Sequence, residues 1–120
     1  MDHKELNVWK ESICLVELAY QYVSKFPQSE LFGLSNQMRR CAVSIPSNIA
    51  EGEGRNSDTD RLRFLGIARG SLAELETQVI IAQRLRLTED SSQDLLDQII
   101  IVQKLLNGFI TYLHNKNNNE

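Results

Sequence analysis

Apolar residues recur along this chain at steps of three and four, the spacing that places them on one side of an α-helix. Four segments carry the pattern, at 6–25, 29–52, 57–86 and beyond a short loop at 88–92. Strand signals are weak throughout, so the pattern predicts an all-α protein. Four long amphipathic helices with short connections favour an antiparallel up-and-down four-helix bundle.

Each segment carries an apolar stripe that we expect to face the core. The stripe of the first segment comprises Trp9, Ile13, Val16, Tyr20 and Val23. The stripe of the fourth comprises Leu95, Ile99, Val102, Leu106, Phe109 and Leu113, widened by Leu96, Ile100, Leu105 and Ile110. A helix that is apolar over most of its circumference needs more cover than two bundle neighbours give. The width of the fourth stripe therefore indicates either self-association or a broad intramolecular core.

Proline, glycine and a capping pattern mark the predicted helix ends. Pro46 lies inside the second segment, where it removes a backbone donor, so we expect a kink or a short break there. Gly52 and Gly54 then supply the stop of that helix. Ser57 and Asp60 resemble a capping box at the start of the third helix.

A length of 120 residues suits one domain, which we place at 1–115, followed by a disordered asparagine-rich tail at 116–120. The formal net charge of -3 excludes a global basic field that would draw the chain to nucleic acid or membrane. No apolar run approaches the roughly 20 residues of a membrane span, and the N-terminus is not a signal peptide. Cys14 and Cys41 are interpreted as small core residues in a reducing compartment, so we place the protein in the cytoplasm.

The arginines are segregated, since all eight lie within 31–86 and no lysine does. The planar guanidinium group suits carboxylates and phosphates, whereas lysine is a point charge. Solvated helix faces with intramolecular partners are the simpler interpretation of this pattern. A surface for an anionic partner is the alternative.

A polar row lies beside the core stripe of the second segment. Its members are Gln37, Arg40, Ser44, Asn48 and Glu51. Glu74 on the third segment could reach Arg40 or Asn48 across the bundle. Because buried polar groups are normally paired, we predict a structural hydrogen-bond network here, with a ligand or catalytic pocket as the less favoured alternative.

Small residues form a row on the third segment, at Gly66, Gly70, Ala73 and Thr77. A glycine inside a helix costs about 1 kcal/mol relative to alanine, so another interaction should offset it. Close approach of another helix backbone is the natural explanation. We therefore assign helix packing to Pro46, Gly52, Gly66, Gly70 and Ala73.

No arrangement of residues matches a catalytic or metal-binding pattern that we can recognise. Neither His3 nor His114 has a glutamate three residues before it, as a di-iron bundle needs, and the Cys and His residues of a zinc site are not clustered. The stretch 52–57 follows a helix and lacks the lysine of a phosphate loop. We predict no enzymatic activity, no catalytic residue, no cofactor and no metal.

Several stretches are specific enough to indicate a family. They are Phe26-Pro27, Gly33-Leu34, Gln37-Met38-Arg39-Arg40, Ser44-Ile45-Pro46-Ser47-Asn48-Ile49-Ala50-Glu51-Gly52 and the ten residues 67–76. Over almost its whole length the chain resembles the bacterial four-helix bundle proteins often labelled 23S rRNA-intervening-sequence proteins. The resemblance implies a homopentameric ring without enzymatic activity. Similar proteins accompany diversity-generating retroelements, where a basic pentameric relative binds nucleic acid and its reverse transcriptase.

The resemblance and the arginine segregation together predict a non-enzymatic, self-assembling scaffold that binds RNA or an RNA-handling protein. The candidate contacts are Arg39, Arg55, Arg61, Arg63, Arg84 and Arg86, provided that they gather on one surface. This chain departs from the basic relative in being mildly acidic. One alternative is a protein–protein adaptor without nucleic-acid binding. Another is a bundle with a small-molecule site at the row of Ser44, Asn48 and Glu51.

Overall fold

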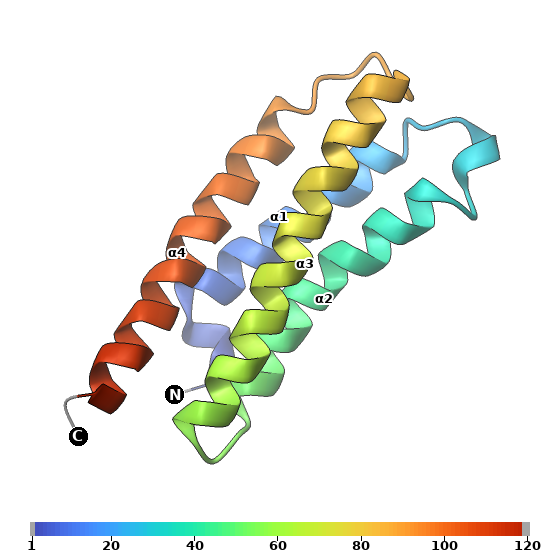
Figure 1. Ribbon diagram of the computed structural model, residues 1–120. Helices are drawn as coiled ribbons and strands as arrows, with labels where there is room; N and C mark the ends of the chain where they lie inside the picture. The colour runs from blue at the N-terminus through green and yellow to red at the C-terminus, as the bar shows by residue number, and fades with distance from the viewer. Residues whose placement is uncertain (1, 119–120) are drawn as a thin grey trace.

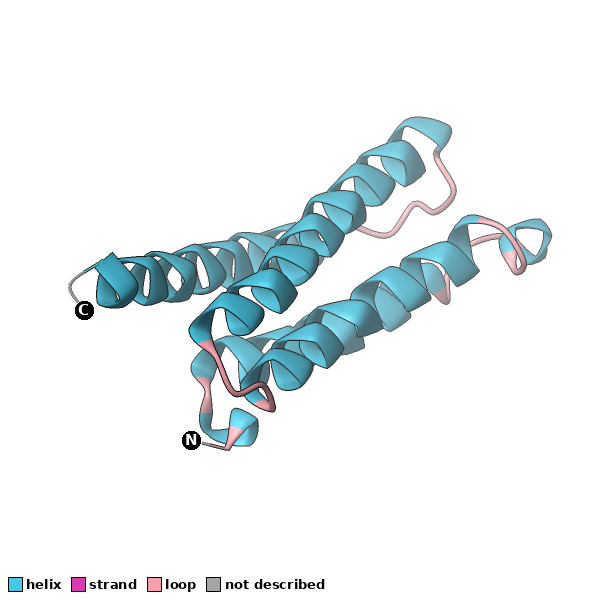
Figure 2. Cartoon of the chain, turned by 60° about the horizontal axis from the view of Figure 1, so that its bottom comes forward, coloured by secondary structure: helices cyan, strands magenta, loops and turns pink. Residues whose placement is uncertain are grey.

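Four long helices make up most of the computed structural model, which describes residues 2–118 (Figure 1). They are α1 (Asn7–Val23), α2 (Leu34–Glu53), α3 (Asp58–Leu85) and α4 (Gln93–Asn118), with short 3-10 turns η1 (His3–Glu5) and η2 (Gln28–Glu30). Consecutive helices run in opposite directions, and the described residues contain no strand (Figure 2). The predicted all-α class and the four helices are confirmed.

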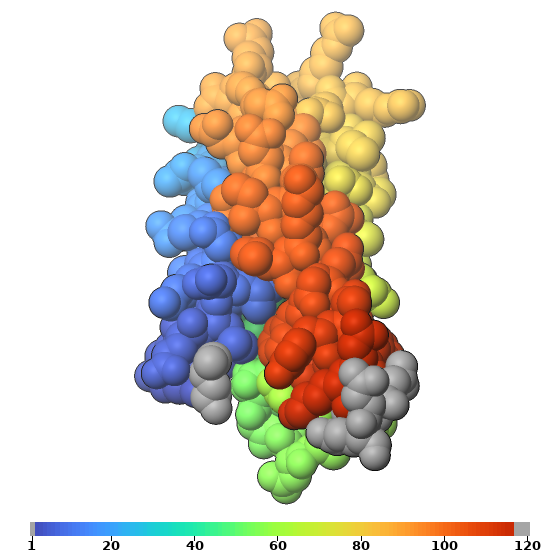
Figure 3. Space-filling view, turned by 90° about the vertical axis from the view of Figure 1, so that its left-hand side faces the viewer, coloured from blue at the N-terminus to red at the C-terminus, as the bar shows by residue number. Residues whose placement is uncertain are grey.

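Each helix packs against two others, so the bundle has four sides. α2 and α4 each contact α1 and α3, whereas α1 and α3 lie on a diagonal. Figure 3 shows α4 lying between α1 and α3 on one side of the molecule. The bundle measures 52 × 22 × 21 Å, so groups at opposite ends of α3 are too far apart to share one small site.

The start of α2 differs from the prediction. After Pro27 the chain forms η2 and a turn at 31–33, so α2 begins at Leu34 rather than at residue 29. The Glu30 side chain accepts a hydrogen bond from the Leu34 N–H at 3.3 Å. This contact satisfies one of the free donors that every helix start exposes, and it fixes where α2 begins.

Three other predicted boundaries have clear outcomes. The Ser57 hydroxyl caps α3 by accepting a hydrogen bond from the Asp60 N–H at 3.2 Å, as the sequence predicts. α2 continues through Pro46, so of the expected kink or short break, the break does not occur. α4 continues to Asn118, beyond the predicted end of the domain at 115, and 119–120 lie outside the described residues.

The core is filled from all four helices. The predicted stripes of α3 and α4 are buried over most of their length, as at Leu72, Leu75, Ile99 and Leu106. The wide apolar face of α4 is divided between the core and the surface, because Ile110 is buried whereas Ile100 is exposed. None of the described helices combines the length and the apolar character that crossing a membrane requires.

The predicted stripe of α1 lies beside the core rather than in it. The residues of α1 that are buried are Val8, Ser12, Leu15, Ala19, Tyr22 and Val23. Trp9, Ile13 and Val16 are half-buried, and Tyr20 is exposed. α1 must face both α2 and α4, and the small Ser12 fits between them because its hydroxyl donates to the Trp9 carbonyl oxygen at 2.7 Å. Of the predicted stripe, only Val23 therefore belongs to the core.

Candidate functional site

The outward side of α3 carries an apolar strip, which we call the α3 face, bordered by exposed charged residues such as Arg69 and Glu74. It comprises Gly66, Ile67, Gly70, Ala73, Thr77, Ile80 and Ile81, all exposed. The three isoleucines retain 41–45% of their accessible surface. A Cβ added at Gly66 or Gly70 would meet no atom within 4 Å. The predicted close approach of another helix backbone to these glycines is therefore not made by any described residue of the same chain.

Gly52 differs from Gly66 and Gly70, because it lies where two helices of the chain approach each other closely. A Cβ there would lie 3.2 Å from the Phe64 Cβ and 3.4 Å from the Arg61 carbonyl oxygen. The end of α2 therefore approaches the start of α3 so closely that a Cβ at this position would be tightly packed. Pro46 is also buried, on the side of α2 that faces α1.

A hollow of about 300 Å³ runs between α1 and α2 on the outside of the bundle, and we call it the α1–α2 groove. Its lining consists of His3, Trp9, Ile13, Val16, Val43, Pro46, Ser47 and Ala50. A second hollow, of about 390 Å³, shares Val43 and continues toward Tyr20 and Asn36 at the upper end of α2. No Asp, Glu, Lys or Arg lines the first hollow, so the predicted α1 stripe is the floor of an open apolar groove.

The predicted polar row on α2 does not form a continuous network. The Ser44 hydroxyl donates to the Cys41 carbonyl oxygen at 2.6 Å, and the Asn48 amide donates to the Ser44 carbonyl oxygen at 2.7 Å. These bonds stay within α2, so each side chain is paired with the backbone of its own helix. The small-molecule site considered for this row is not assembled, because the second hollow takes in Ser44 but neither Asn48 nor Glu51.

Within the part of the chain that the structure covers, the other residues of the predicted polar network make no hydrogen bond or ion pair beyond the next helical turn. Glu51 pairs with Arg55 one turn on, and Glu74 accepts a hydrogen bond from the Gln78 amide at 3.3 Å. Gln37 and Arg40 are exposed, and the suggested contact of Glu74 with Arg40 or Asn48 is not formed in the described part of the chain. The Gln78 Oε1 atom is buried without a hydrogen-bond partner among the described residues.

An ion network that the sequence analysis missed lies at the end of the bundle where α2 ends and α3 begins. We call this the lower end, after its position in Figure 1. Arg61 Nη2 lies 2.6 Å from Glu53 Oε1, and Arg61 Nη1 lies 3.1 Å from Asp58 Oδ1. Lys116 Nζ lies 3.5 Å from the other oxygen of Asp58, which ties α4 to the start of α3. The spacing of Asp58 and Arg61, three residues apart at a helix start, was the only sequence signal for this network.

Burial and charge act against each other in this network. Burial alone would lower the pKa of Arg61, but its hydrogen bonds and ion pairs with Glu53 and Asp58 raise it overall. Burial likewise tends to raise the pKa of Asp58, but hydrogen bonds from Arg61 and the charge of Lys116 hold it below its usual value. Both shifts favour the ionised forms of Arg61 and Asp58, which is what a structural clamp requires.

Cations and aromatic rings alternate beside this network. The Arg55 and Arg63 guanidinium carbons lie 4.5 and 4.7 Å from the centroid of the Phe64 ring, within range of a cation–π interaction. Arg55 also lines a hollow of about 530 Å³ together with Tyr112 and Lys116. Tyr112 is 61% exposed, so an aromatic face is open at the rim of that hollow.

The six predicted nucleic-acid contacts do not form one surface within a single chain. Arg55, Arg61 and Arg63 lie at the lower end, where the guanidinium group of Arg61 is already occupied by two carboxylates. Arg84 and Arg86 lie at the opposite end of α3, and Arg86 closes that helix in a left-handed conformation with φ of 52°. The guanidinium group of Arg39 lies 5.7 Å from the Tyr20 ring centroid on the α1–α2 side.

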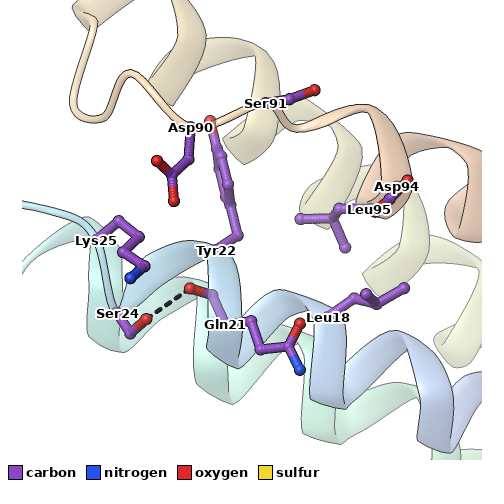
Figure 4. Close-up of a pocket in the computed structure, with 9 residues that line it drawn as sticks. All are labelled: Leu18, Gln21, Tyr22, Ser24, Lys25, Asp90, Ser91, Asp94 and Leu95. Atoms are coloured by element: carbon purple, nitrogen blue, oxygen red, sulfur yellow. Dashed lines mark hydrogen bonds between the residues drawn. The ribbon is translucent and has the colours of Figure 1, made fainter.

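The upper end carries a polar hollow of about 410 Å³ between the end of α1 and the loop before α4 (Figure 4). Lys25, Asp90 and Asp94 stand around it, and Tyr22 projects from α1 toward the loop. Burial raises the pKa of the Tyr22 hydroxyl, and a hydrogen bond with Ser92 partly offsets the effect. The described residues contain no group of three His, Cys, Asp or Glu side chains that could hold a metal ion.

The two cysteines occupy different environments. Cys41 is buried, and its thiol donates to the Ser71 carbonyl oxygen at 3.0 Å. Burial, assisted by the charge of Glu74, raises the pKa of the Cys41 thiol to about 12, so it stays protonated and unreactive. Cys14 is exposed, and its predicted place in the core is therefore wrong.

These features describe a class of protein: an all-α bundle whose polar residues serve mainly caps, local hydrogen bonds and ion pairs, and which exposes apolar residues along α3 and in the α1–α2 groove. The chain belongs to the 23S rRNA-intervening sequence protein family, since the model of that family matches residues 4–108. The match covers α1, α2 and α3 completely and α4 as far as Gly108. The resemblance noted in the sequence is confirmed. No curated protein matches the chain.

Proposed function

We propose that this chain is a non-enzymatic subunit that assembles with copies of itself into a scaffold, most simply the homopentameric ring that the family resemblance implies. The observation that carries the proposal is the α3 face. It exposes three isoleucines and two glycines over about four turns of helix, with Glu74 between Ile67 and Ile81 and with Arg69 beside Gly70. Exposed apolar patches of this kind mark protein–protein interaction sites.

The chain exposes 7161 Å² as an elongated bundle of 52 × 22 × 21 Å, so every long helix has an outer side on which a second copy could pack. The proposal places the assembly in the cytoplasm, where the free thiols of Cys14 and Cys41 would stay reduced.

Light scattering on the eluting protein tests the proposal, because it gives the mass without assuming a shape. We expect a mass near five times the 13.7 kDa of one chain. A stable mass of another multiple would keep self-assembly and reject the pentamer. A monomer at all concentrations would overturn the proposal and favour a protein–protein adaptor that uses the same exposed surface.

RNA binding is a second candidate function, and the alternating cations and aromatic rings at the lower end favour it. Single strands bind to surfaces where bases stack on aromatic rings and cations contact the phosphates. Arg55, Arg63, Phe64, Tyr112 and Lys116 offer both kinds of group. Nearby carboxylates neutralise these cations, so we expect weak binding that depends more on stacking than on net charge.

Binding of a labelled single-stranded RNA at several salt concentrations tests this second function. With two or three phosphate contacts, the logarithm of the affinity should fall with the logarithm of salt concentration with a slope of about −2. Tyr112→Ala combined with Arg63→Ala should weaken binding. The matched control is Arg84→Ala combined with Arg86→Ala at the opposite end. Equal affinities for the two double variants, or no binding at low salt, would reject the lower end as an RNA site.

A further inference from the structure

We infer that the assembly is head to tail, with the α3 face of one copy docked in the α1–α2 groove of the next copy. This inference rests on the proposed self-assembly and adds the two surfaces that meet. The occupant of the groove is thus a second copy of this chain, presenting the middle of its longest helix.

The groove needs an apolar occupant. Trp9, Ile13 and Val16 on one wall are only half-buried, and Val43 on the other retains 40% of its accessible surface. The buried ring of Pro46 lines the groove as well, in a stretch of helix that carries no charge on this side. Removing such a surface from water is favourable by roughly 25 cal/mol for each Å² of apolar area that is buried.

The α3 face has the shape and length to fill that groove. Gly66 and Gly70 have no side chains, and no atom of their own chain stands near them, so another helix pair can approach the α3 backbone closely. From Gly66 to Ile80 the face is about 21 Å long, at ~1.5 Å per residue. The α1–α2 groove and the second hollow, which shares Val43 with it and is also lined by Arg39 and Arg40, extend along α2 from Asn36 to Ala50, also about 21 Å.

The positions of the two surfaces make the contact head to tail. α1 and α3 lie on a diagonal of the bundle, so one chain cannot cover its own groove with its own α3 face. An α3 face that docks in an α1–α2 groove joins two different surfaces. A row of copies joined in this way therefore still has one free α3 face at one end and one free groove at the other. Such contacts propagate until the ring closes. A contact between two α3 faces would instead end at a dimer and would leave both grooves open.

Two blocking substitutions separate these arrangements. Gly70→Lys places a charge on the α3 face, where a side chain meets nothing in its own chain. Val43→Lys places a charge in the groove at an exposed position. Each variant should fold, as circular dichroism can verify, and each should drop from the mass of the assembly to that of one chain. Thr111→Lys, at an exposed position on α4, is the matched control and should keep the mass of the wild type.

Mixing the two blocked variants gives the decisive result. Gly70→Lys keeps an intact groove and Val43→Lys keeps an intact α3 face, so one head-to-tail contact can still form. The only tryptophan, Trp9, lines the groove and reports on it. When only Gly70→Lys carries the ¹⁵N label, its Trp9 indole N–H signal should shift after unlabelled Val43→Lys is added. When only Val43→Lys carries the label, its Trp9 signal should not shift after unlabelled Gly70→Lys is added, because the groove of Val43→Lys is blocked.

Each other outcome has a definite meaning. If Val43→Lys keeps the mass of the wild type while Gly70→Lys is a monomer, the groove is not the partner of α3 and the inference is overturned. An unshifted Trp9 signal in the mixture overturns it as well. A monomeric wild type refutes the proposed self-assembly itself, which is a separate result.

Discussion

Replacing Gly52 by alanine tests how closely α2 approaches α3. The new Cβ would lie 3.2 Å from the Phe64 Cβ and 3.4 Å from the Arg61 carbonyl oxygen. Neither of these two atoms can rotate away, because one is bonded to the α3 backbone and the other is part of it. The helices must therefore separate by a few tenths of an ångström. Overpacking of this kind costs about 1–3 kcal/mol.

Helix propensity acts in the opposite direction. Alanine is favoured over glycine by about 1 kcal/mol in the middle of a helix. Gly52 is next to the last residue of α2, so the gain there is smaller. We expect Gly52→Ala to lower the free energy of unfolding by about 1–2 kcal/mol. The matched control, Gly108→Ala on α4, adds a Cβ that meets nothing in its own chain, and it should raise that free energy by about 1 kcal/mol.

Urea unfolding followed by circular dichroism measures both effects. Because assembly makes stability depend on protein concentration, the variants and the wild type must be compared at the same concentration. We expect the two variants to differ by about 2–3 kcal/mol, with the wild type between them. A Gly52→Ala protein that is as stable as the wild type would refute the close approach of α2 and α3.

Three further predictions concern single groups. A thiol reagent should modify one cysteine per native chain, Cys14, and reach Cys41 only after unfolding; two fast-reacting thiols in the native protein would contradict the burial of Cys41. Because the folded pKa of Asp58 is depressed, its stabilising effect should be complete above a pH of about 4 and be lost as the pH falls through the folded pKa. The melting temperatures of the wild type and Asp58→Asn should therefore converge in acid, and a constant gap would reject this account. Arg61→Ala should lower the free energy of unfolding by about 1–3 kcal/mol, because it leaves two carboxylates without their partner, and an unchanged urea midpoint would show that the network contributes nothing.

The helices could be predicted from the sequence because apolar spacing and capping residues act locally. The predicted stripe of the third segment runs from Leu62 to Leu85, and its members from Leu65 to Ala82 form the buried side of α3, whereas Leu85 is exposed. The Ser57 cap fixed the first residue of that helix. The first helix shows the limit of this reasoning. Its bulkiest apolar residues, led by Trp9 and Tyr20, line an outer groove, while Ser12 and Ala19 fill the core. The size of a side chain does not determine which neighbouring helix that side chain packs against.

The candidate surfaces were harder to predict because they depend on contacts between distant parts of the chain. The sequence indicated that Gly66 and Gly70 needed an explanation, but only the fold reveals that no helix of the same chain supplies it. The arginines looked like one group because they are close in sequence. In the fold a long helix separates Arg63 from Arg84, and Glu53 reaches Arg61 across a turn that no periodicity describes.

The contact between Gln98 and Glu11 has a consequence for the order of folding. The Gln98 amide donates to the Glu11 carbonyl oxygen at 2.8 Å and to its carboxylate at 2.6 Å, across a separation of 87 residues. The other helix pairs that touch are neighbours in sequence, so hairpins can form early, whereas α1 and α4 must find each other across most of the chain. We expect the contact between α1 and α4 to form last during folding. Gln98→Leu should then speed unfolding in stopped-flow measurements and leave the folding rate nearly unchanged.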